Sequence, residues 1–238
     1  MTTQPLLRVD QIMVRFGGVV AVDRVTLTAE AGRVTGLIGP NGAGKTTLFN
    51  VVTGVQAPTS GQVVFEGSDV TRLAVHRRAR RGLARTFQRL EVFASLSVRD
   101  NVRVATELST LVDVGNRVDS LLERVGLVDV ADRTAGDLPT GQARLVEIAR
   151  ALATEPRLLL LDEPASGLDE AETRRLGELL RSLAEDGLGV LVVEHDMDLV
   201  MKVCDVIHVL DLGQLIATGT PGEVQKDRRV LEAYLGVA

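Results

Sequence analysis

Aromatic residues, cysteine and long apolar runs are all scarce in this chain of 238 residues. Phe, Tyr and Trp together make up 3% of the sequence, so the core must be built from Val, Leu, Ile and Ala. The one cysteine, Cys204, cannot form an internal disulfide, and the chain therefore needs no oxidising compartment. Apolar runs such as Leu158–Leu161 and Val190–Val193 are far shorter than the roughly 18 to 20 residues of a membrane span. We expect any membrane association to depend on a partner.

An excess of basic charge is missing as well. The 27 Lys and Arg residues against 32 Asp and Glu give a net charge of -5, which argues against a nucleic-acid partner. One basic cluster, formed by Arg77, Arg78, Arg80 and Arg81, has no interleaved aromatic residues, so we interpret it as a solvated helix face rather than an RNA site. The N-terminus lacks a basic region followed by an apolar stretch, and we expect the chain to stay in the cytoplasm.

The order of apolar patterns along the chain predicts an α/β fold. The first 35 residues alternate in the manner of antiparallel strands, and a buried strand from Arg33 then leads into a glycine-rich turn and a helix over Lys45–Thr53. Between about residues 90 and 140 the strand signal fades and apolar residues recur at helical spacing, which predicts a helical subdomain. We expect one domain over residues 1–238.

Strands and helices alternate again after this helical stretch, which favours a parallel sheet. The predicted elements are a helix at Gln142–Ala153, a strand at Leu158–Leu161, a helix at Glu170–Glu185 and a strand at Val190–Val193.

A phosphate-binding loop lies between the predicted strand and the helix that follows it. The residues Gly39, Pro40, Asn41, Gly42, Ala43, Gly44, Lys45 and Thr46 fit the pattern G-x-x-x-x-G-K-[ST], known as Walker A. Backbone N–H groups of such a loop and the helix N-terminus face the phosphates of ATP, and glycines permit their close approach. Lys45 is predicted to contact the β- and γ-phosphates and Thr46 to bind Mg²⁺, with a further phosphate contact from Thr47.

Two adjacent carboxylates follow the apolar strand Leu158–Leu161. Such a strand end alone would be interpreted as a pair of solvated acids, but together with Lys45 it resembles the Walker B position of phosphate-loop enzymes. Asp162 is predicted to belong to the Mg²⁺ shell and Glu163 to act as the general base for the attacking water.

These motifs, with others in the same order, resemble the ATP-binding-cassette family over nearly the whole chain. The resemblance implies that Gln88 senses the metal and the γ-phosphate and links them to a membrane partner, and that His195 is the switch histidine beside the γ-phosphate. It also places Phe16 where an aromatic residue stacks on adenine, with a core phenylalanine as the alternative. His76 and His208 lack such a setting and are expected to be structural or surface residues.

The family signature L-S-G-G-Q corresponds to Leu138, Pro139, Thr140, Gly141 and Gln142 and departs from it at two positions. In the family, the signature of one subunit closes over the ATP of the other, which implies a homodimer or a heterodimer with a homologous ATPase. Pro139 offers neither a hydroxyl nor an N–H group. Two hypotheses stay open: a weakened contact between subunits, with Thr140 as substitute hydroxyl, or recognition of the γ-phosphate by backbone groups. Asp169 matches the D-loop, which in the family lies against the partner's phosphate loop.

Within the family, Gly17-Gly18, the run from Gly82 to Gln88 and the C-terminal tail from Thr218 resemble the ATPases of branched-chain amino-acid importers. The resemblance implies an ATP- and Mg²⁺-dependent, peripheral subunit on the cytoplasmic face of a bacterial membrane, bound to integral-membrane permease subunits and without direct contact to the transported solute. A lipid or lipopolysaccharide exporter ATPase is an alternative. A non-transport cassette ATPase is disfavoured because the chain has neither a second cassette nor a long coiled-coil insertion.

Overall fold

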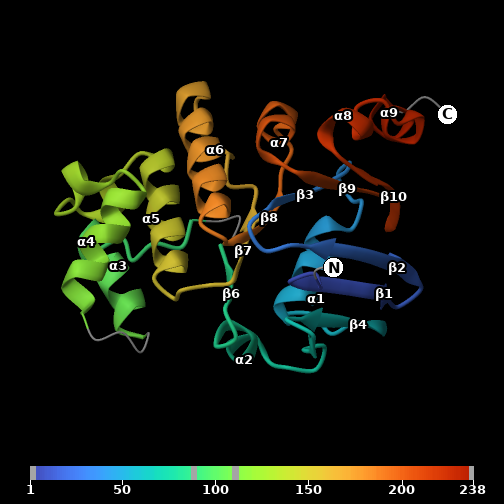
Figure 1. The fold of residues 1–238 in the computed structure, drawn as a ribbon, viewed down its shortest axis with the longest axis horizontal. Coiled ribbons are helices and arrows are strands. Elements are labelled where there is room, and N and C mark those ends of the chain that lie inside the picture. Colours follow the sequence, from blue (N-terminus) through green and yellow to red (C-terminus); the bar gives the residue numbers. More distant parts are fainter. Residues whose placement is uncertain (1–3, 87–89, 109–112, 236–238) are drawn as a thin grey trace.

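The computed structural model describes residues 4–86, 90–108 and 113–235. None of the helices in these ranges combines the length and the apolar composition that a membrane span requires. The predicted α/β architecture is confirmed: two sheets and several layers of helices are packed together (Figure 1).

The larger sheet has six strands in the order β10-β9-β3-β8-β7-β6. Five of them run parallel, and only β10 is antiparallel to its neighbour β9. The fully buried strands β3, β7 and β8 match the continuous apolar runs of the sequence. The bounds are β3 Val34–Ile38, β6 Leu83–Arg85, β7 Leu158–Asp162, β8 Gly189–Val193, β9 Val206–Asp211 and β10 Gln214–Gly219.

The smaller sheet is antiparallel and has the order β2-β1-β4-β5. Its first two strands confirm the antiparallel pairing that the alternating pattern predicts, and they pair over most of their length. The tight turn at Glu66 and Gly67 joins the last two strands, and both turn residues have positive φ angles. The bounds are β1 Leu7–Phe16, β2 Val19–Ala29, β4 Ser60–Phe65 and β5 Ser68–Asp69.

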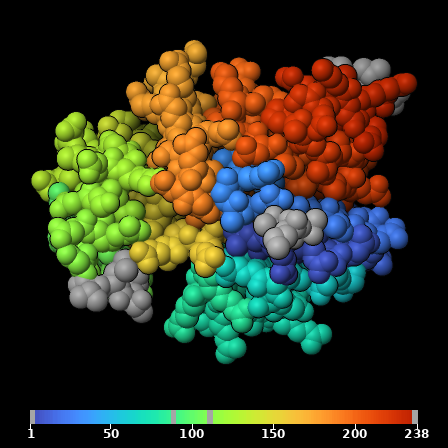
Figure 2. Space-filling view, in the orientation of Figure 1, coloured from blue at the N-terminus to red at the C-terminus, as the bar shows by residue number. Residues whose placement is uncertain are grey.

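The helices fall into two groups around the larger sheet. Helix α1 packs between the two sheets, whereas α5, α6 and α7 cover the opposite face of the larger sheet. Helices α3 and α4 form a lobe at one end of the molecule, drawn in green in Figure 2. The bounds are α1 Lys45–Thr53, α2 Val75–Ala79, α3 Val98–Glu107, α4 Val114–Arg124, α5 Thr140–Leu152, α6 Glu170–Glu185, α7 Met197–Val203, α8 Pro221–Val224 and α9 Arg228–Leu235, with short 3-10 turns at Val128–Val130 and Ala135–Asp137.

Two predictions about these elements are wrong. Helix α5 begins at Thr140 rather than Gln142, because the carbonyl of Pro139 already accepts the first helical hydrogen bond, from the N–H of Ala143. Arg78 does not belong to a solvated face, since it is 2% exposed. Its guanidinium donates to the carbonyls of Val51 and Val52, both at 2.7 Å, and so closes the C-terminal end of α1.

Candidate functional site

The phosphate-binding loop joins the end of β3 to the start of α1, as the sequence predicts. Gly39 has a φ of 151°, and a Cβ atom there would lie 2.0 Å from the carbonyl oxygen of Leu210 on β9. Gly44 has a φ of 100°, and its Cβ would lie 2.5 Å from the carbonyl oxygen of Ala21 on β2. Neighbouring strands therefore approach the loop so closely that glycine is required at both ends of it.

Lys45 is folded back along this loop. Its side chain is 6% exposed, and Nζ donates to the carbonyl oxygens of Gly39 at 2.6 Å and Pro40 at 3.0 Å. Burial lowers the pKa of Lys45, while the carboxylates of Glu163 and Asp162 act in the opposite direction. The three groups that the sequence assigns to catalysis and phosphate binding thus lie within one electrostatic environment.

The register of the parallel strands brings these groups together. Val193, the last residue of β8, pairs with Leu37 of β3 on one side and with Asp162 of β7 on the other. The three strands therefore end at the same level of the sheet, where ligand sites of open α/β sheets form.

Glu163 follows immediately with a φ of 50°, a left-handed conformation that is uncommon for a non-glycine residue. Its backbone N–H donates to the carbonyl of Val193, which holds this sharp turn in place.

Glu163 and His195 are directly connected. The Nε2 atom of His195 lies 2.7 Å from Oε1 of Glu163, although the two residues are far apart in the sequence. Together with Ala21 and the residues from Asn41 to Thr47 they line a cavity of about 220 Å³. The cavity thus combines a row of loop N–H groups, a lysine and a carboxylate–imidazole pair, an arrangement able to hold a polyphosphate and to orient a water molecule beside it.

Glu194 is a member of this region to which the sequence assigned no role. Its buried carboxylate accepts hydrogen bonds from the backbone N–H groups of Ala165 at 2.7 Å and His195 at 3.0 Å. Desolvation raises the pKa of Glu194, and these backbone donors partly oppose that shift. The side chain therefore joins the segment after Glu163 to the segment that carries His195. The one signal in the sequence for the role of Glu194 was its position between the apolar strand that ends at Val193 and His195.

Phe16 lies at the end of β1 and is 51% exposed. The alternative interpretation as a core phenylalanine is therefore wrong. Adenine stacking by Phe16 stays a prediction.

The signature residues are located elsewhere. Leu138 and Pro139 immediately precede α5, while Thr140, Gly141 and Gln142 form its first turn. In Figure 1, α5 and α1 lie on opposite sides of β7 and α6.

The neighbours of the signature are the segments around Asp169. A Cβ on Gly141 would lie 2.4 Å from Oε1 of Glu172, and one on Gly167 would lie 3.3 Å from Cγ2 of Thr140. Asp169 accepts a hydrogen bond from the backbone N–H of Glu172 and so caps α6. Within one chain, the signature and the D-loop residue are adjacent to each other rather than to the phosphate loop.

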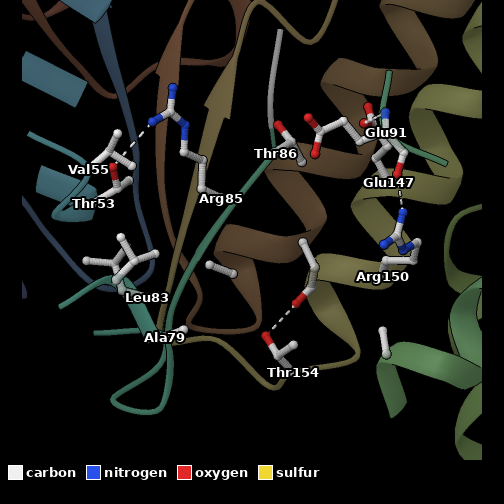
Figure 3. A pocket seen from close by; sticks show the side chains of 14 residues that line it. Thr53, Val55, Ala79, Leu83, Arg85, Thr86, Glu91, Glu147, Arg150 and Thr154 are labelled. Carbon is white, nitrogen blue, oxygen red and sulfur yellow. Dashed lines mark hydrogen bonds between the residues drawn. The ribbon is translucent and has the colours of Figure 1, made fainter. Parts of the chain in front are cut away.

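A second hollow, of about 330 Å³, lies between α2, β6 and α5 (Figure 3). Thr53 and Arg85 line it on one side, and Glu147 and Arg150 of α5 line it on the other. Gln88, to which the resemblance assigns a metal-sensing role, lies outside the described residues, between Thr86 and Glu91 of this lining.

The side chains of α5 hold the segment that follows Gln88. Glu147 accepts the backbone N–H of Glu91 at 2.6 Å, and Arg150 donates to the carbonyl of Glu91. The guanidinium of Arg150 also lies 4.5 Å from the ring centroid of Phe93. Desolvation raises the pKa of Glu147, a buried carboxylate. The helix that begins with the signature therefore also anchors one wall of the hollow, a connection that the sequence did not reveal.

A strand, a glycine-rich loop and a helix, with two carboxylates at the end of a nearby strand, define a phosphate-loop ATPase. A family model described as "ABC transporter" matches residues 22–166. The chain therefore belongs to the ABC transporter family and is one of its ATP-hydrolysing subunits. A second model, described as "Branched-chain amino acid ATP-binding cassette transporter", matches residues 214–238.

Individual relatives agree with this assignment. The chain is 41% identical to the high-affinity branched-chain amino acid transport ATP-binding protein LivG of Salmonella typhimurium, over 99% of this chain and 100% of the relative. It is 37% identical to the lipopolysaccharide export system ATP-binding protein LptB of Escherichia coli, over 90% of each chain. The ADP conformation of MJ1267, an ATP-binding cassette of an ABC transporter, superposes with a TM-score of 0.89 at 32% identity, over 98% of this chain and all of the other.

Proposed function

We propose that this chain powers an importer of branched-chain amino acids or similar small polar solutes. The similarity to LivG over the full length of both proteins supports this substrate class. The C-terminal match over residues 214–238 supports it independently, because this segment lies outside the region common to the ABC transporter model. Lipopolysaccharide or lipid export is the second candidate, favoured by the 37% identity to LptB.

The proposed roles of the site residues follow from the cavity beside the phosphate loop. The loop from Gly39 to Thr47 would cradle the phosphates of ATP, and Lys45 would exchange its two carbonyl partners for phosphate oxygens. Glu163 would accept the proton of the attacking water, and His195 would hold that carboxylate and the γ-phosphate in place.

Mg²⁺ fits the oxygen donors at this edge of the sheet. Thr46 contributes a hydroxyl at the first turn of α1 and Asp162 a carboxylate at the end of β7. Among the residues with described positions, no group of three or more His, Cys, Asp and Glu side chains forms a metal cage. Mg²⁺ prefers oxygen ligands and is usually bound through one or two carboxylates together with substrate phosphates. When bound, the ion would neutralise charge on the β- and γ-phosphates.

One observation carries the proposed dimer mechanism: the phosphate loop and the signature do not meet within a chain. The cavity is lined by the loop, β2 and the residues after β7 and β8, whereas Thr140 and Gly141 begin α5 and lie beside Gly167 and Glu172. A signature can contribute to an ATP site only if a second chain supplies it. ATP would therefore join two chains, with Asp169 near the partner's loop, and hydrolysis would release them.

The hollow beside Arg85 and Glu147 is the proposed docking site for a helix of the permease subunits. Thr86 and Glu91, which line this hollow, flank Gln88 in the sequence. Glu91 is held by side chains of α5, the helix that begins with the signature. A helix bound there at the cytoplasmic face of a bacterial membrane would contact both parts of the ATPase. Residues 1–238 would serve as one nucleotide-binding domain, with the helices between about 90 and 140 as a helical subdomain within it.

The mechanism is tested by Glu163→Gln. We expect ATP hydrolysis to fall by about 10²- to 10⁴-fold, because the general base is removed, and the ATP-bound chain to accumulate as a dimer in size-exclusion chromatography. Glu178→Gln, on the exposed surface of α6, is the matched control and should leave both unchanged. A Glu163→Gln variant that stays monomeric with undiminished turnover would contradict the mechanism.

The transport role needs a separate experiment. Membranes of the source organism should yield a complex of this chain with permease subunits, and its disruption should reduce uptake of radiolabelled leucine. Normal leucine uptake together with a defect in outer-membrane lipid export would favour the second candidate.

A further inference from the structure

Arg85 connects two elements that the proposed function places on the metal side of the site. It is the last residue of β6, the strand at the edge of the larger sheet. Its Nη2 atom lies 2.9 Å from Oδ2 of Asp162, and its Nη1 atom donates to Oδ1 of Asn50 at 2.6 Å. One planar guanidinium therefore holds the end of β7 and the middle of α1 at a fixed separation.

The contact with Asn50 matters because of its place on α1. Asn50 is four residues after Thr46, so the two side chains lie on the same face of the helix, one turn apart. Thr46 and Asp162 are the two residues proposed to face Mg²⁺, and they belong to separate elements of the fold. Arg85 thus holds the carboxylate of Asp162 directly, and it holds the hydroxyl of Thr46 indirectly, through Asn50 and one turn of α1.

The surroundings keep this contact dry. The side chains of Arg85 and Asp162 are 10% and 5% exposed, and the guanidinium carbon lies 5.2 Å from the ring centroid of Phe49. In such a setting an ion pair is only weakly screened by water, and loss of one partner is costly. A carboxylate accepts through two oxygens, so the bond at Oδ2 leaves Oδ1 able to accept from a hydrated metal ion.

We propose that Arg85 is a positioning residue that sets the geometry between Asp162 and Thr46 for the metal-bound nucleotide. This inference rests on the proposed function of the site. It adds that the metal contribution to ATP binding depends on an arginine that touches neither nucleotide nor metal. The same side chain lines the hollow proposed for the permease, so a docked helix would contact the residue that orients Asp162.

The experiment compares nucleotide affinity with and without metal. Calorimetric titration with the non-hydrolysable analogue adenylyl imidodiphosphate, in Mg²⁺ and in EDTA, gives a ratio of dissociation constants for each variant. We expect Arg85→Met to reduce the Mg²⁺-dependent gain in affinity by about 10- to 100-fold, the usual cost of losing an outer partner of a metal ligand. The affinity in EDTA should stay near that of the unchanged protein.

Arg85→Lys separates positioning from charge. Lysine keeps the positive charge but cannot hold Asp162 and Asn50 at once in a planar fork, so we expect most of the metal effect to be lost. Arg157→Met is the matched control: this arginine lies next to the start of β7, at the opposite end of the same strand pair, and is 65% exposed. It should behave as the unchanged protein.

The outcomes are distinguishable. An unchanged Mg²⁺ effect in both Arg85 variants, or a tighter Mg²⁺ complex in Arg85→Met, would overturn the inference while leaving the proposed function intact. An equal loss in Mg²⁺ and EDTA would also overturn it, because Arg85 would then support the loop as a whole. If Arg85 variants fail to fold, Asn50→Ala tests the same link and should lose a smaller part of the metal effect. Failure of the unchanged protein to bind the nucleotide would contradict the proposed function itself.

Discussion

Helices α1 and α5, like the five-residue helix α2 after Ala74, begin without a side-chain cap. Helices α3, α4, α6 and α7 each start with a Ser or Asp side chain that accepts a hydrogen bond from their first turn. At the same position α1 has Gly44 and α5 has Pro139, neither of which has a side-chain acceptor. The N–H groups and the positive dipole end of these two helices are therefore left for an anion.

The two helix ends differ in what surrounds them. The start of α1 faces a cavity that already contains Lys45, Glu163 and His195. The start of α5 is on the surface, with Pro139 and Thr140 exposed. The N-terminal end of α1 thus forms a ligand cavity together with other residues of the same chain. The N-terminal end of α5 is instead exposed to a ligand bound by another chain. Because of this difference, we expect substitutions at the two helix ends to have unequal effects on stability and on ATP binding.

Gly39→Ala should damage the α1 end most. The new methyl group would lie 2.0 Å from a backbone carbonyl oxygen, which cannot move away without distorting β9. We expect a loss of roughly 3 kcal/mol or more in the free energy of unfolding and no measurable ATP binding. Gly42→Ala is the matched control, since a Cβ there meets none of the described atoms within 4 Å and only its φ of 81° is unfavourable. It should unfold about 1 kcal/mol more easily. Equal losses would show that close approach of β9 is unimportant.

Arg78→Met should loosen the opposite end of α1. The guanidinium is buried and donates to carbonyls at the end of the helix, so its removal leaves buried acceptors without partners. We expect denaturant unfolding to show a loss of about 2 to 4 kcal/mol. Arg81→Met, at an exposed position nearby, should change stability by less than about 0.5 kcal/mol. Similar stabilities of the Arg78→Met and Arg81→Met variants would mean that the C-terminal end of α1 does not depend on the guanidinium of Arg78.

Pro139→Ser should sharpen the comparison at the α5 end. Without nucleotide the introduced hydroxyl can accept from the first turn, and in the ATP-bound dimer it would instead donate to the γ-phosphate of the partner's ATP, as the serine of the family signature does. Stability should change little, because the gain from a cap opposes the loss of proline rigidity. We expect ATP turnover or ATP-driven dimerisation to rise roughly twofold to tenfold, the value of one hydrogen bond. Unchanged rates in both assays would mean that backbone groups alone read the γ-phosphate.

The smallest effect concerns the scaffold shared by both helix ends. His208 on β9 is buried, with Nε2 2.9 Å from the carbonyl oxygen of Thr28 and Nδ1 2.9 Å from the hydroxyl of Thr218. Burial lowers its pKa in the folded chain, only partly offset by the contact with Thr28. The folded state therefore binds protons less readily than the unfolded one. Its contribution to stability is complete above the unfolded pKa of about 6.5 and is lost as the pH falls through that value toward the lower folded pKa.

Denaturant unfolding between about pH 7.5 and pH 5.5 measures this contribution. The unchanged protein should lose more stability over the interval than His208→Gln, which has no group that titrates there. Equal losses of stability in the two proteins would contradict the interpretation that His208 is buried in its neutral form.

Structure that depends on residues adjacent in sequence could be predicted, whereas contacts between residues distant in sequence could be predicted only in part. The phosphate loop was predicted in full because its conformation depends on glycines and a strand–helix junction within one short segment. Asp162, Glu163 and His195 were predicted one by one, and the structure brings Glu163 and His195 together because the parallel strands β7 and β8 end at one edge of the sheet. The contacts of Glu194 and Arg85 were not predictable, because a charged residue next to a strand has the same local pattern whether it is solvated or paired. Arg78, on helix α2, was misjudged because a basic residue on a short helix likewise has the same local pattern whether it is solvated or buried against carbonyl groups.

By itself, the sequence predicted a phosphate-binding loop, a catalytic carboxylate pair and a second, altered anion-binding motif at Leu138. Each of these depends on neighbouring residues and on the secondary structure that they form. Only the tertiary structure decided that the loop and the signature face different parts of the molecule. It did so because the strand order β3-β8-β7 is not the chain order, which brings Glu163 and His195 to the loop and leaves the start of α5 beyond α6. The same packing buries Arg85 against Asp162, a contact that no local pattern specifies.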